Sequence, residues 1–264
     1  MNNRGIGVFD SGLGGLTVVK EIMKILPGER IIYLGDTARY PYGTKTKDTI
    51  IRFSSENTEF LLDKKVKIIV VACNTASAAA LPGLKKNYDT DITGVVEAGA
   101  AAAVKNTKNN KIGVIGTRAT INSGAYKKAI KKLDKNADVT LNAAPLLAPL
   151  VEEGWINKKE TVSILEYYLK PFKKKKIDTL LLGCTHYPLL KPLIKKLMPR
   201  AAIIDSASVT ARRVRDILDR KKMRAKKDNR KSSAFYVTDT PETFNKVGRM
   251  FLKKDMVPAK KVSL

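Results

Sequence analysis

Hydrophobic residues fall along this chain in short runs, separated by longer stretches that mix apolar and polar positions. Six runs, each about the length of a buried strand, occur at residues 5–9, 31–34, 66–72, 111–116, 177–182 and 234–237. Between them apolar positions recur at helical spacing, as at residues 16, 19, 22, 23 and 26. Strands that alternate with helices predict an α/β fold with mainly parallel sheets, in which ligands bind at the carboxyl ends of the strands.

The two halves of the chain echo each other. Residues 6–11 (IGVFDS) resemble residues 112–117 (IGVIGT), and residues 70–75 (VVACNT) resemble residues 181–186 (LLGCTH). Because the two pairs are separated by nearly the same distance along the sequence, we expect two similar domains with mainly parallel sheets flanked by helices. The two cysteines, each at the end of an apolar strand, would then meet in a cleft between the domains.

The bulk composition is that of a chain that folds by itself. Of its 264 residues 44% are hydrophobic, which is enough for a sizeable core. Residues 1–9 lack the long apolar stretch and the cleavage site of a signal peptide, and no run of roughly 18 apolar residues predicts a membrane span. Two cysteines are too few for a disulfide framework. We therefore expect a cytoplasmic protein with free thiols.

The charge balance is the unusual feature of the composition. Lys and Arg number 50 against 25 Asp and Glu, which gives a net charge of +25. The basic residues are densest at 173–176 and 220–231, and we expect residues 220–233 to be an exposed connection. This balance leaves open an anionic partner, either nucleic acid or an acidic protein. We do not expect one, because aromatic side chains are not interleaved with the basic runs and a solvated surface explains them.

Cys73 and Cys184 are the candidates for chemistry. Each follows an apolar run and precedes hydrogen-bonding residues, at 74–75 and 185–186. A thiol has a pKa of roughly 8.5 and becomes a base once it is deprotonated. A helix N-terminus after each strand would favour the thiolate. A hydrolase built on one cysteine and His186 is conceivable, but it would leave the second cysteine without a role.

We expect neither a metal nor a cofactor. Two cysteines and one histidine are fewer ligands than zinc sites in proteins use. The glycine-rich turn at residues 10–15 follows a strand and begins a helix, but Thr17 stands where a dinucleotide loop needs its last glycine, and the phosphate-loop motif is absent. Free N–H groups in this turn would suit a small carboxylate.

Longer motifs occur in six blocks. They are VFDSGLGGL (8–16), GDTARYPYG (35–43), ACNTAS (72–77), GVIGTRATI (113–121), PLVEEG (149–154) and GCTHYPLL (183–190). In content and order the blocks resemble those of glutamate racemases, in the aspartate/glutamate racemase family. The resemblance extends over residues 5–207, with a weaker tail at residues 235–252.

The resemblance implies both a fold and an activity. Residues 1–95, completed by residues 208–264, would form one α/β domain and residues 96–207 the other, with the active site in the cleft between them. The protein would be a homodimer that interconverts L-glutamate and D-glutamate without a cofactor, by proton transfer at Cα through two thiols. Its D-glutamate would supply peptidoglycan synthesis.

The resemblance also assigns site residues, position by position. The residues that match catalytic positions are Cys73, Cys184, Asp10, Glu152 and His186. Those that match substrate-binding positions are Asp10, Ser11, Tyr42, Gly43, Asn74, Thr75, Thr185 and His186. Thr117 and Thr120 are weaker candidates for a carboxylate contact. The chain departs from the family's usual pattern at Ala98 and Ala144, where neither position matches a catalytic role.

Two alternatives stay open at this point. The nearer is a racemase of another amino acid, such as aspartate, on the same scaffold. Aspartate racemases share the paired cysteines but usually carry an acidic residue where His186 stands. The more distant alternative is a basic protein that binds nucleic acid or an acidic partner.

Overall fold

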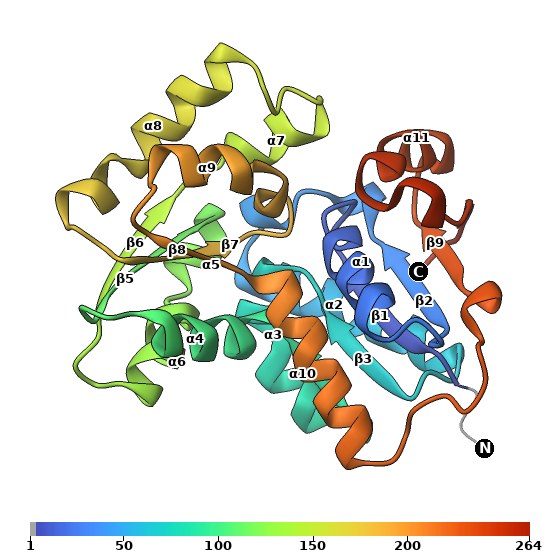
Figure 1. Ribbon diagram of the computed structural model, residues 1–264. Helices are drawn as coiled ribbons and strands as arrows, with labels where there is room; N and C mark the ends of the chain where they lie inside the picture. The colour runs from blue at the N-terminus through green and yellow to red at the C-terminus, as the bar shows by residue number, and fades with distance from the viewer. Residues whose placement is uncertain (1–3) are drawn as a thin grey trace.

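The structure, a computed structural model, describes residues 4–264 except for the side chain of Lys254. Its strands form two sheets, and every described pair of neighbouring strands is parallel (Figure 1). The α/β fold predicted from the apolar runs is confirmed. Residues 1–3, on which the expectation of a missing signal peptide partly rests, lie outside the described part of the chain.

The first sheet has the strand order β10-β9-β2-β1-β3-β4. Its strands are β1 (Ile6–Asp10), β2 (Ile31–Gly35), β3 (Ile68–Val71), β4 (Ile92–Gly94), β9 (Ala234–Val237) and β10 (Ala259–Lys261). The helices connecting them are α1 (Leu16–Ile25), α2 (Lys47–Asp63), α3 (Asn74–Asn87) and α11 (Pro241–Leu252). We call this sheet and these helices the first half.

The second sheet has the strand order β6-β5-β7-β8. Its strands are β5 (Lys111–Gly116), β6 (Asp138–Ala143), β7 (Thr179–Gly183) and β8 (Ala202–Asp205). Its helices are α4 (Val95–Asn106), α5 (Arg118–Asn122), α6 (Ala125–Leu133), α7 (Leu147–Glu152), α8 (Lys159–Lys174) and α9 (Lys191–Leu197). We call these elements the second half. Helix α10 (Ser206–Arg220) packs on both α1 and α4 and so joins the two halves (Figure 1).

The two halves repeat one topology. The order β2-β1-β3-β4 in the first sheet has its counterpart in β6-β5-β7-β8, so that β1 corresponds to β5 and β3 to β7. The segments that echo each other in the sequence lie on these corresponding strands. The expectation of two similar, mainly parallel sheets flanked by helices is therefore confirmed.

All six predicted runs contain a strand, but four strands have no such run. These four, β4, β6, β8 and β10, are the outer strands of the two sheets. An outer strand is covered on fewer sides than a central one, so it needs no continuous apolar sequence. In β6, for example, no residue is fully buried.

The core lies on both faces of the first sheet. Side chains alternate along a strand, so Val8 of β1 and Val70 of β3 join one apolar layer, which includes α1 and α10. Phe9 and Val71 join the opposite layer, which includes α2 and α3. Among residues 4–264 no helix is long and apolar enough to cross a bilayer.

A buried ion pair attaches the basic connection at the end of α10, residues 220–233, to the first half. Most of this connection is exposed, as predicted. Lys67 Nζ donates to Glu29 Oε2 over 2.6 Å and to the carbonyl of Met223 over 2.8 Å. The other oxygen of Glu29 accepts the Ala225 N–H at 2.8 Å. Because the side chains of both Lys67 and Glu29 are buried, the pair anchors an otherwise solvated segment to the first half.

Removing the cation of this pair should destabilise the protein. We expect Lys67→Met to lower the free energy of unfolding by about 3 kcal/mol, because Glu29 would remain charged and buried without a partner. The double variant Lys67→Met/Glu29→Gln should recover part of the loss. Urea denaturation of the variants measures both values. A loss below about 1 kcal/mol in the single variant, the range of exposed pairs, would contradict the expectation.

Candidate active site

Both cysteines line one cavity. Its volume is about 170 Å³, and its walls come from both halves of the molecule. The residues predicted for the site that line it are Ser11, Tyr42, Gly43, Cys73, Asn74, Thr75, Cys184, Thr185 and His186. The other two predicted residues, Asp10 and Glu152, are not among the lining residues and reach it through their hydrogen bonds to Thr185 and His186.

Strand ends explain why the two sulfur atoms face the same space. Cys73 lies two residues beyond the end of β3 and immediately before α3. Cys184 directly follows β7, the corresponding strand of the second sheet, and precedes a 3-10 helix at Tyr187–Leu190. The cavity therefore lies at the carboxyl ends of both parallel sheets, where such folds bind ligands.

Asp10 is fully buried at the end of β1. Its Oδ2 accepts the N–H of Gly12 at 3.0 Å, and Gly15 provides a second backbone hydrogen bond. Its Oδ1 accepts the Thr185 hydroxyl at 3.3 Å. Burial raises the pKa of Asp10 above its usual value, although the positive charge of His186 and these hydrogen bonds act in the opposite direction.

Two N–H groups of the glycine-rich turn are already occupied. The turn was expected to suit the carboxylate of a ligand, but its Gly12 and Gly15 N–H groups bind the carboxylate of Asp10. The turn also touches the second half. A Cβ atom on Gly14 would lie 2.6 Å from Nδ1 of His186, so only glycine allows this approach.

Cys73 lies beside this buried carboxylate. Its thiol donates to the hydroxyl of Ser11 over 3.6 Å. Burial and then the charge of Asp10 raise the pKa of Cys73 to about 12, while the N–H of Ala76 and the Ser11 hydroxyl oppose the rise. The N-terminus of α3 thus contributes in the expected direction, through Ala76, but it does not outweigh burial.

Cys184 has a different neighbour. Nδ1 of His186 lies 3.7 Å from its sulfur, and Nε2 of the same ring lies 2.7 Å from Oε1 of Glu152, at the end of α7. Burial disfavours the imidazolium, but the hydrogen bonds to Cys184 and Glu152 outweigh it and raise the pKa of His186 to about 10. Protonation of the ring is therefore favoured, and in the protonated ring one N–H group would donate to the sulfur and the other to the carboxylate.

Three threonine hydroxyls form a cluster at the junction of the halves. Thr75, Thr117 and Thr120 lie within 2.9 to 3.1 Å of one another, oxygen to oxygen. The first two line the cavity, whereas Thr120 does not. The weaker candidates from the sequence are thus next to a predicted substrate-binding residue.

Two tyrosines support the site although the sequence did not single them out. Tyr126 donates to Oδ1 of Asn74 at 2.5 Å, and Tyr33 donates to the carbonyl of Gly12 at 2.6 Å. Both tyrosines are buried and look like core residues in the sequence. With Oδ1 occupied, Nδ2 of Asn74 is a buried donor for which the described residues offer no acceptor.

Residues of the metal-binding types are not clustered here. Within the described part of the chain, no group of three or more His, Cys, Asp or Glu side chains is arranged to hold a metal ion. Both cysteines are free thiols. What the arrangement offers chemically is two thiols from the two halves, each with its own titratable neighbour. They line a cavity together with Asn74, whose Nδ2 has no acceptor among the described residues.

Comparison with known proteins agrees with this geometry. The family model for Asp/Glu/hydantoin racemases matches residues 6–214. The chain is 47% identical to the glutamate racemase of Neisseria meningitidis over 262 residues, which cover 99% of this chain and 97% of that protein. An aspartate racemase structure from Picrophilus torridus, at 18% identity and a TM-score of 0.58, shares the fold alone.

Two solved structures are much more similar. That of glutamate racemase isoform RacE1 from Bacillus anthracis has a TM-score of 0.96 and 41% identity, and covers 100% of this chain and 99% of its own. That of the Francisella tularensis glutamate racemase, in complex with D-glutamate, has a TM-score of 0.93 and 41% identity, with coverage of 100% and 98%. Fold, site and relatives together define an amino-acid racemase. The chain belongs to the Asp/Glu/hydantoin racemase family.

The charge state of His186 can be tested directly, because it is the only histidine in the chain. Its NMR titration should give a pKa near 10 rather than its ordinary 6.5. Replacement of Glu152 by Gln should move this value back toward 6.5, because the hydrogen-bonded carboxylate that stabilises the imidazolium would be lost. A variant that titrates like the wild type would contradict this role for Glu152.

The same shift predicts a pH dependence of stability. Since the pKa of His186 is higher in the folded than in the unfolded protein, its contribution is complete below pH 6.5 and is lost as the pH rises through about 10. The difference in unfolding free energy between wild type and Glu152→Gln should therefore shrink as the pH rises from 6.5 to about 10.

Proposed function

We propose that the protein interconverts L-glutamate and D-glutamate without a cofactor, by proton transfer at Cα between Cys73 and Cys184. The observation that carries the proposal is the pair of thiols at corresponding strand ends of the two halves, both lining one cavity. The close similarity to glutamate racemases over nearly the whole chain supports glutamate as the substrate.

Racemisation requires two groups on opposite faces of the substrate carbon. One thiolate removes the Cα proton, and the thiol on the other face delivers its own proton to the resulting carbanion. After one turnover the first sulfur carries a proton and the second does not, so the reverse reaction starts from the opposite state. Because burial raises the pKa of Cys73, its thiolate is a stronger base once formed.

Negative charge builds on the substrate carboxylate as the proton leaves. The free Nδ2 of Asn74 supports binding of that carboxylate, since it is a buried donor at the cavity wall. Thr75, at the N-terminus of α3, adds a hydroxyl and the favourable end of the helix. Fixed donors of this kind stabilise developing charge more effectively than water does.

The two sulfur atoms have unlike neighbours, which suggests different roles. Asp10 adjoins Cys73 and, with its raised pKa, is suited to accept the thiol proton before the reaction. Cys184 instead adjoins His186, whose other ring nitrogen contacts Glu152. We propose that Cys73 deprotonates D-glutamate and Cys184 deprotonates L-glutamate.

We also propose a division of the chain into two domains and a role in cell-wall synthesis. One domain would consist of residues 1–95 and 208–264 and the other of residues 96–207. The presence of β9 and β10 in the first sheet supports this division. The D-glutamate produced would supply peptidoglycan synthesis, as the resemblance to glutamate racemases implies.

Incubation of each glutamate enantiomer with purified protein in D₂O tests the proposed reaction. Both enantiomers should racemise and acquire deuterium at Cα. Aspartate should be turned over roughly 100-fold less efficiently, because a chain one methylene shorter leaves polar groups of the site unpaired. Equal turnover of aspartate would assign the protein to racemases of another amino acid, and absence of exchange would overturn the proposal.

The roles of the thiols predict a specific pattern in variants. Cys73→Ala and Cys184→Ala should each reduce racemisation by a factor on the order of 10³ or more, because each removes one of two acid–base groups. Binding of glutamate should persist in both. Cys→Ser variants should also be severely impaired, because a hydroxyl is rarely ionised near neutrality.

A glutamate analogue with a leaving group at Cβ separates the two bases. Elimination requires removal of only one proton, so each Cys→Ala variant should process one enantiomer and not the other. Cys184→Ala should act on the D form and Cys73→Ala on the L form. If either variant processes both forms equally, one mobile base is at work and the two-thiol mechanism is wrong.

A further inference from the structure

The segment between β2 and α2 forms part of the cavity wall. We call residues 37–44 the strap. Residues 40–44 of the strap, which include Tyr42 and Gly43, line the cavity. The strap also touches the second half, because a Cβ atom on Gly43 would lie 2.9 Å from Cβ of Thr117. A small displacement of the strap would therefore change both the cavity and the junction of the two halves.

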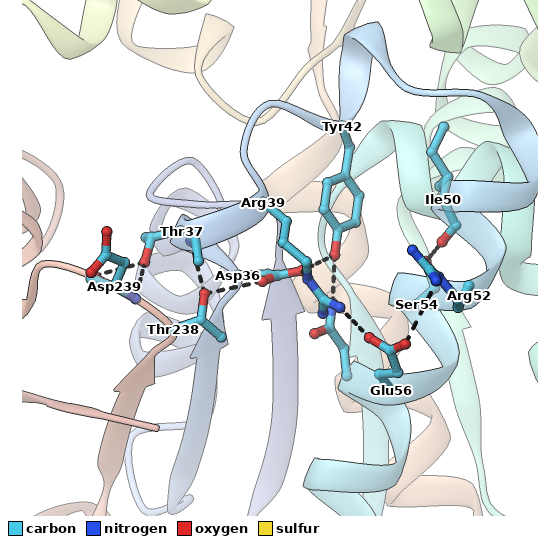
Figure 2. A network of polar contacts seen from close by, with 12 residues as sticks. Asp36, Thr37, Arg39, Tyr42, Ile50, Arg52, Ser54, Glu56, Thr238 and Asp239 are labelled. Atoms are coloured by element: carbon cyan, nitrogen blue, oxygen red, sulfur yellow. Dashed lines mark hydrogen bonds and ion pairs between the residues drawn. The ribbon is translucent and has the colours of Figure 1, made fainter. Parts of the chain in front are cut away.

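A buried carboxylate lies behind the strap. Asp36 follows β2 directly and is fully buried, but it does not line the cavity. Its Oδ2 accepts from Nε of Arg39 at 2.7 Å and from the hydroxyl of Tyr42 (Figure 2). Its Oδ1 accepts from the hydroxyl of Thr238 at 3.0 Å. Two of these three donors belong to the strap, so Asp36 holds the strap from its buried side.

The hydroxyl of Tyr42 is used by the protein itself. It donates to Asp36 and accepts from Nδ2 of Asn57 at 3.0 Å. Burial and then the charge of Asp36 raise the pKa of Tyr42 well above its usual range, so the hydroxyl keeps its proton. Tyr42 therefore borders the cavity with other atoms, and its hydroxyl serves to hold the strap rather than to bind a ligand.

The start of the strap is fastened to the C-terminal part of the chain. The hydroxyl of Thr238, just beyond β9, accepts the N–H of Ala38 at 2.8 Å. The hydroxyl of Thr37 donates to the carbonyl of Asp239 at 2.7 Å and accepts its N–H at 2.8 Å. These residues are about 200 positions apart in the sequence, so the return of the chain to the first sheet completes the support of the strap.

Helix α2 provides a third support. Arg39 forms an ion pair with Glu56, and its guanidinium lies over the ring of Phe53, 4.0 Å from the centroid. Both partners are residues of α2. The strap is thus held by the end of β2, by α2 and by the segment after β9. Asp36 accepts hydrogen bonds both from the strap and from Thr238 of that last segment.

We propose that Asp36 is a positioning residue of the active site. It fixes the position of the strap through its hydrogen bonds to Tyr42 and Arg39, and through Thr238 it makes the segment after β9 a support of the cavity wall. The choice of glutamate as the substrate for testing this inference rests on the proposed glutamate racemase function. The assignment goes beyond that function, because Asp36 contacts neither thiol and does not line the cavity.

A carboxylate is required here because all of its partners donate. An ionised carboxylate only accepts, whereas an amide presents one N–H₂ group. In the variant Asp36→Asn that group would either meet another donor, Nε of Arg39, or reverse the hydrogen bond with the hydroxyl of Thr238. The substitution keeps the size of the side chain, but in either orientation of the amide it removes the negative charge that pairs with Arg39.

We expect Asp36→Asn to raise KM for both glutamate enantiomers on the order of tenfold, with a smaller change in kcat. Strap residues that line the cavity would contact the substrate equally before and during proton transfer, so displacement of the strap should remove uniform binding. Glu29→Gln is the matched control, since Glu29 is a buried carboxylate of the same half that does not line the cavity. It should lose stability and keep the wild-type KM.

Two further variants test the connections on either side of Asp36. Tyr42→Phe removes only the hydroxyl that faces Asp36 and should raise KM as Asp36→Asn does. Thr238→Val removes a hydroxyl at nearly constant volume and should also raise KM, whereas Thr238→Ser should restore it. Thr238→Val keeps the test decisive if Asp36→Asn fails to fold.

Hydrogen–deuterium exchange without substrate separates this inference from the proposed function. Amides of residues 37–44 should exchange faster in Asp36→Asn and Thr238→Val than in wild type, and at the wild-type rate in Glu29→Gln. Wild-type exchange and KM in both strap variants would overturn the inference, as would an equal rise of KM in Glu29→Gln. A wild-type protein that does not racemise glutamate would overturn the proposed function alone, because the exchange experiment needs no substrate.

Discussion

The close contact of the glycine-rich turn with the end of β7 holds the site together. Without a side chain at Gly14 the turn approaches His186 and Thr185. Thr17 then donates to the carbonyl of Thr185 at 3.0 Å, and the Thr185 hydroxyl donates back to Asp10. A carboxylate of the first half thus accepts a hydrogen bond from the second half. The two sulfur atoms face one cavity because the halves are joined at this point.

The repeated topology places the thiols alike, but it does not make their surroundings alike. In the echo of the two halves Asp10, the last residue of β1, corresponds to Gly116, the last residue of β5. Thr75 corresponds in the same way to His186. The carboxylate beside Cys73 and the imidazole beside Cys184 therefore have no counterpart in the other half. Equivalent strands supply the geometry, and single non-equivalent residues give each thiol a different titratable neighbour.

Central strands and the cysteines at their ends were predictable, because buried strands require continuous apolar runs. The outer strands were not, since partial exposure removes that signal. The partners of Asn74 and Asp36 were also hidden. Tyr126 is 52 residues from Asn74, and Thr238 is 202 residues from Asp36, and neither residue type suggests its role. The pKa of Cys73 depends on its depth below the surface, which its sequence neighbours do not indicate.

The positive charge of the chain acts at a different range from the charges of the site. The first 95 residues contain 13 Lys and Arg against 10 Asp and Glu, whereas residues 96–264 contain 37 against 15. The basic residues of 173–176 and 220–231 are exposed, so salt screens them beyond about 8 Å. Asp10, Asp36 and His186 are buried, and water screens their interactions much less. The surface can therefore vary in charge with little effect on these buried groups, and its field acts instead on the rate at which anions approach the protein.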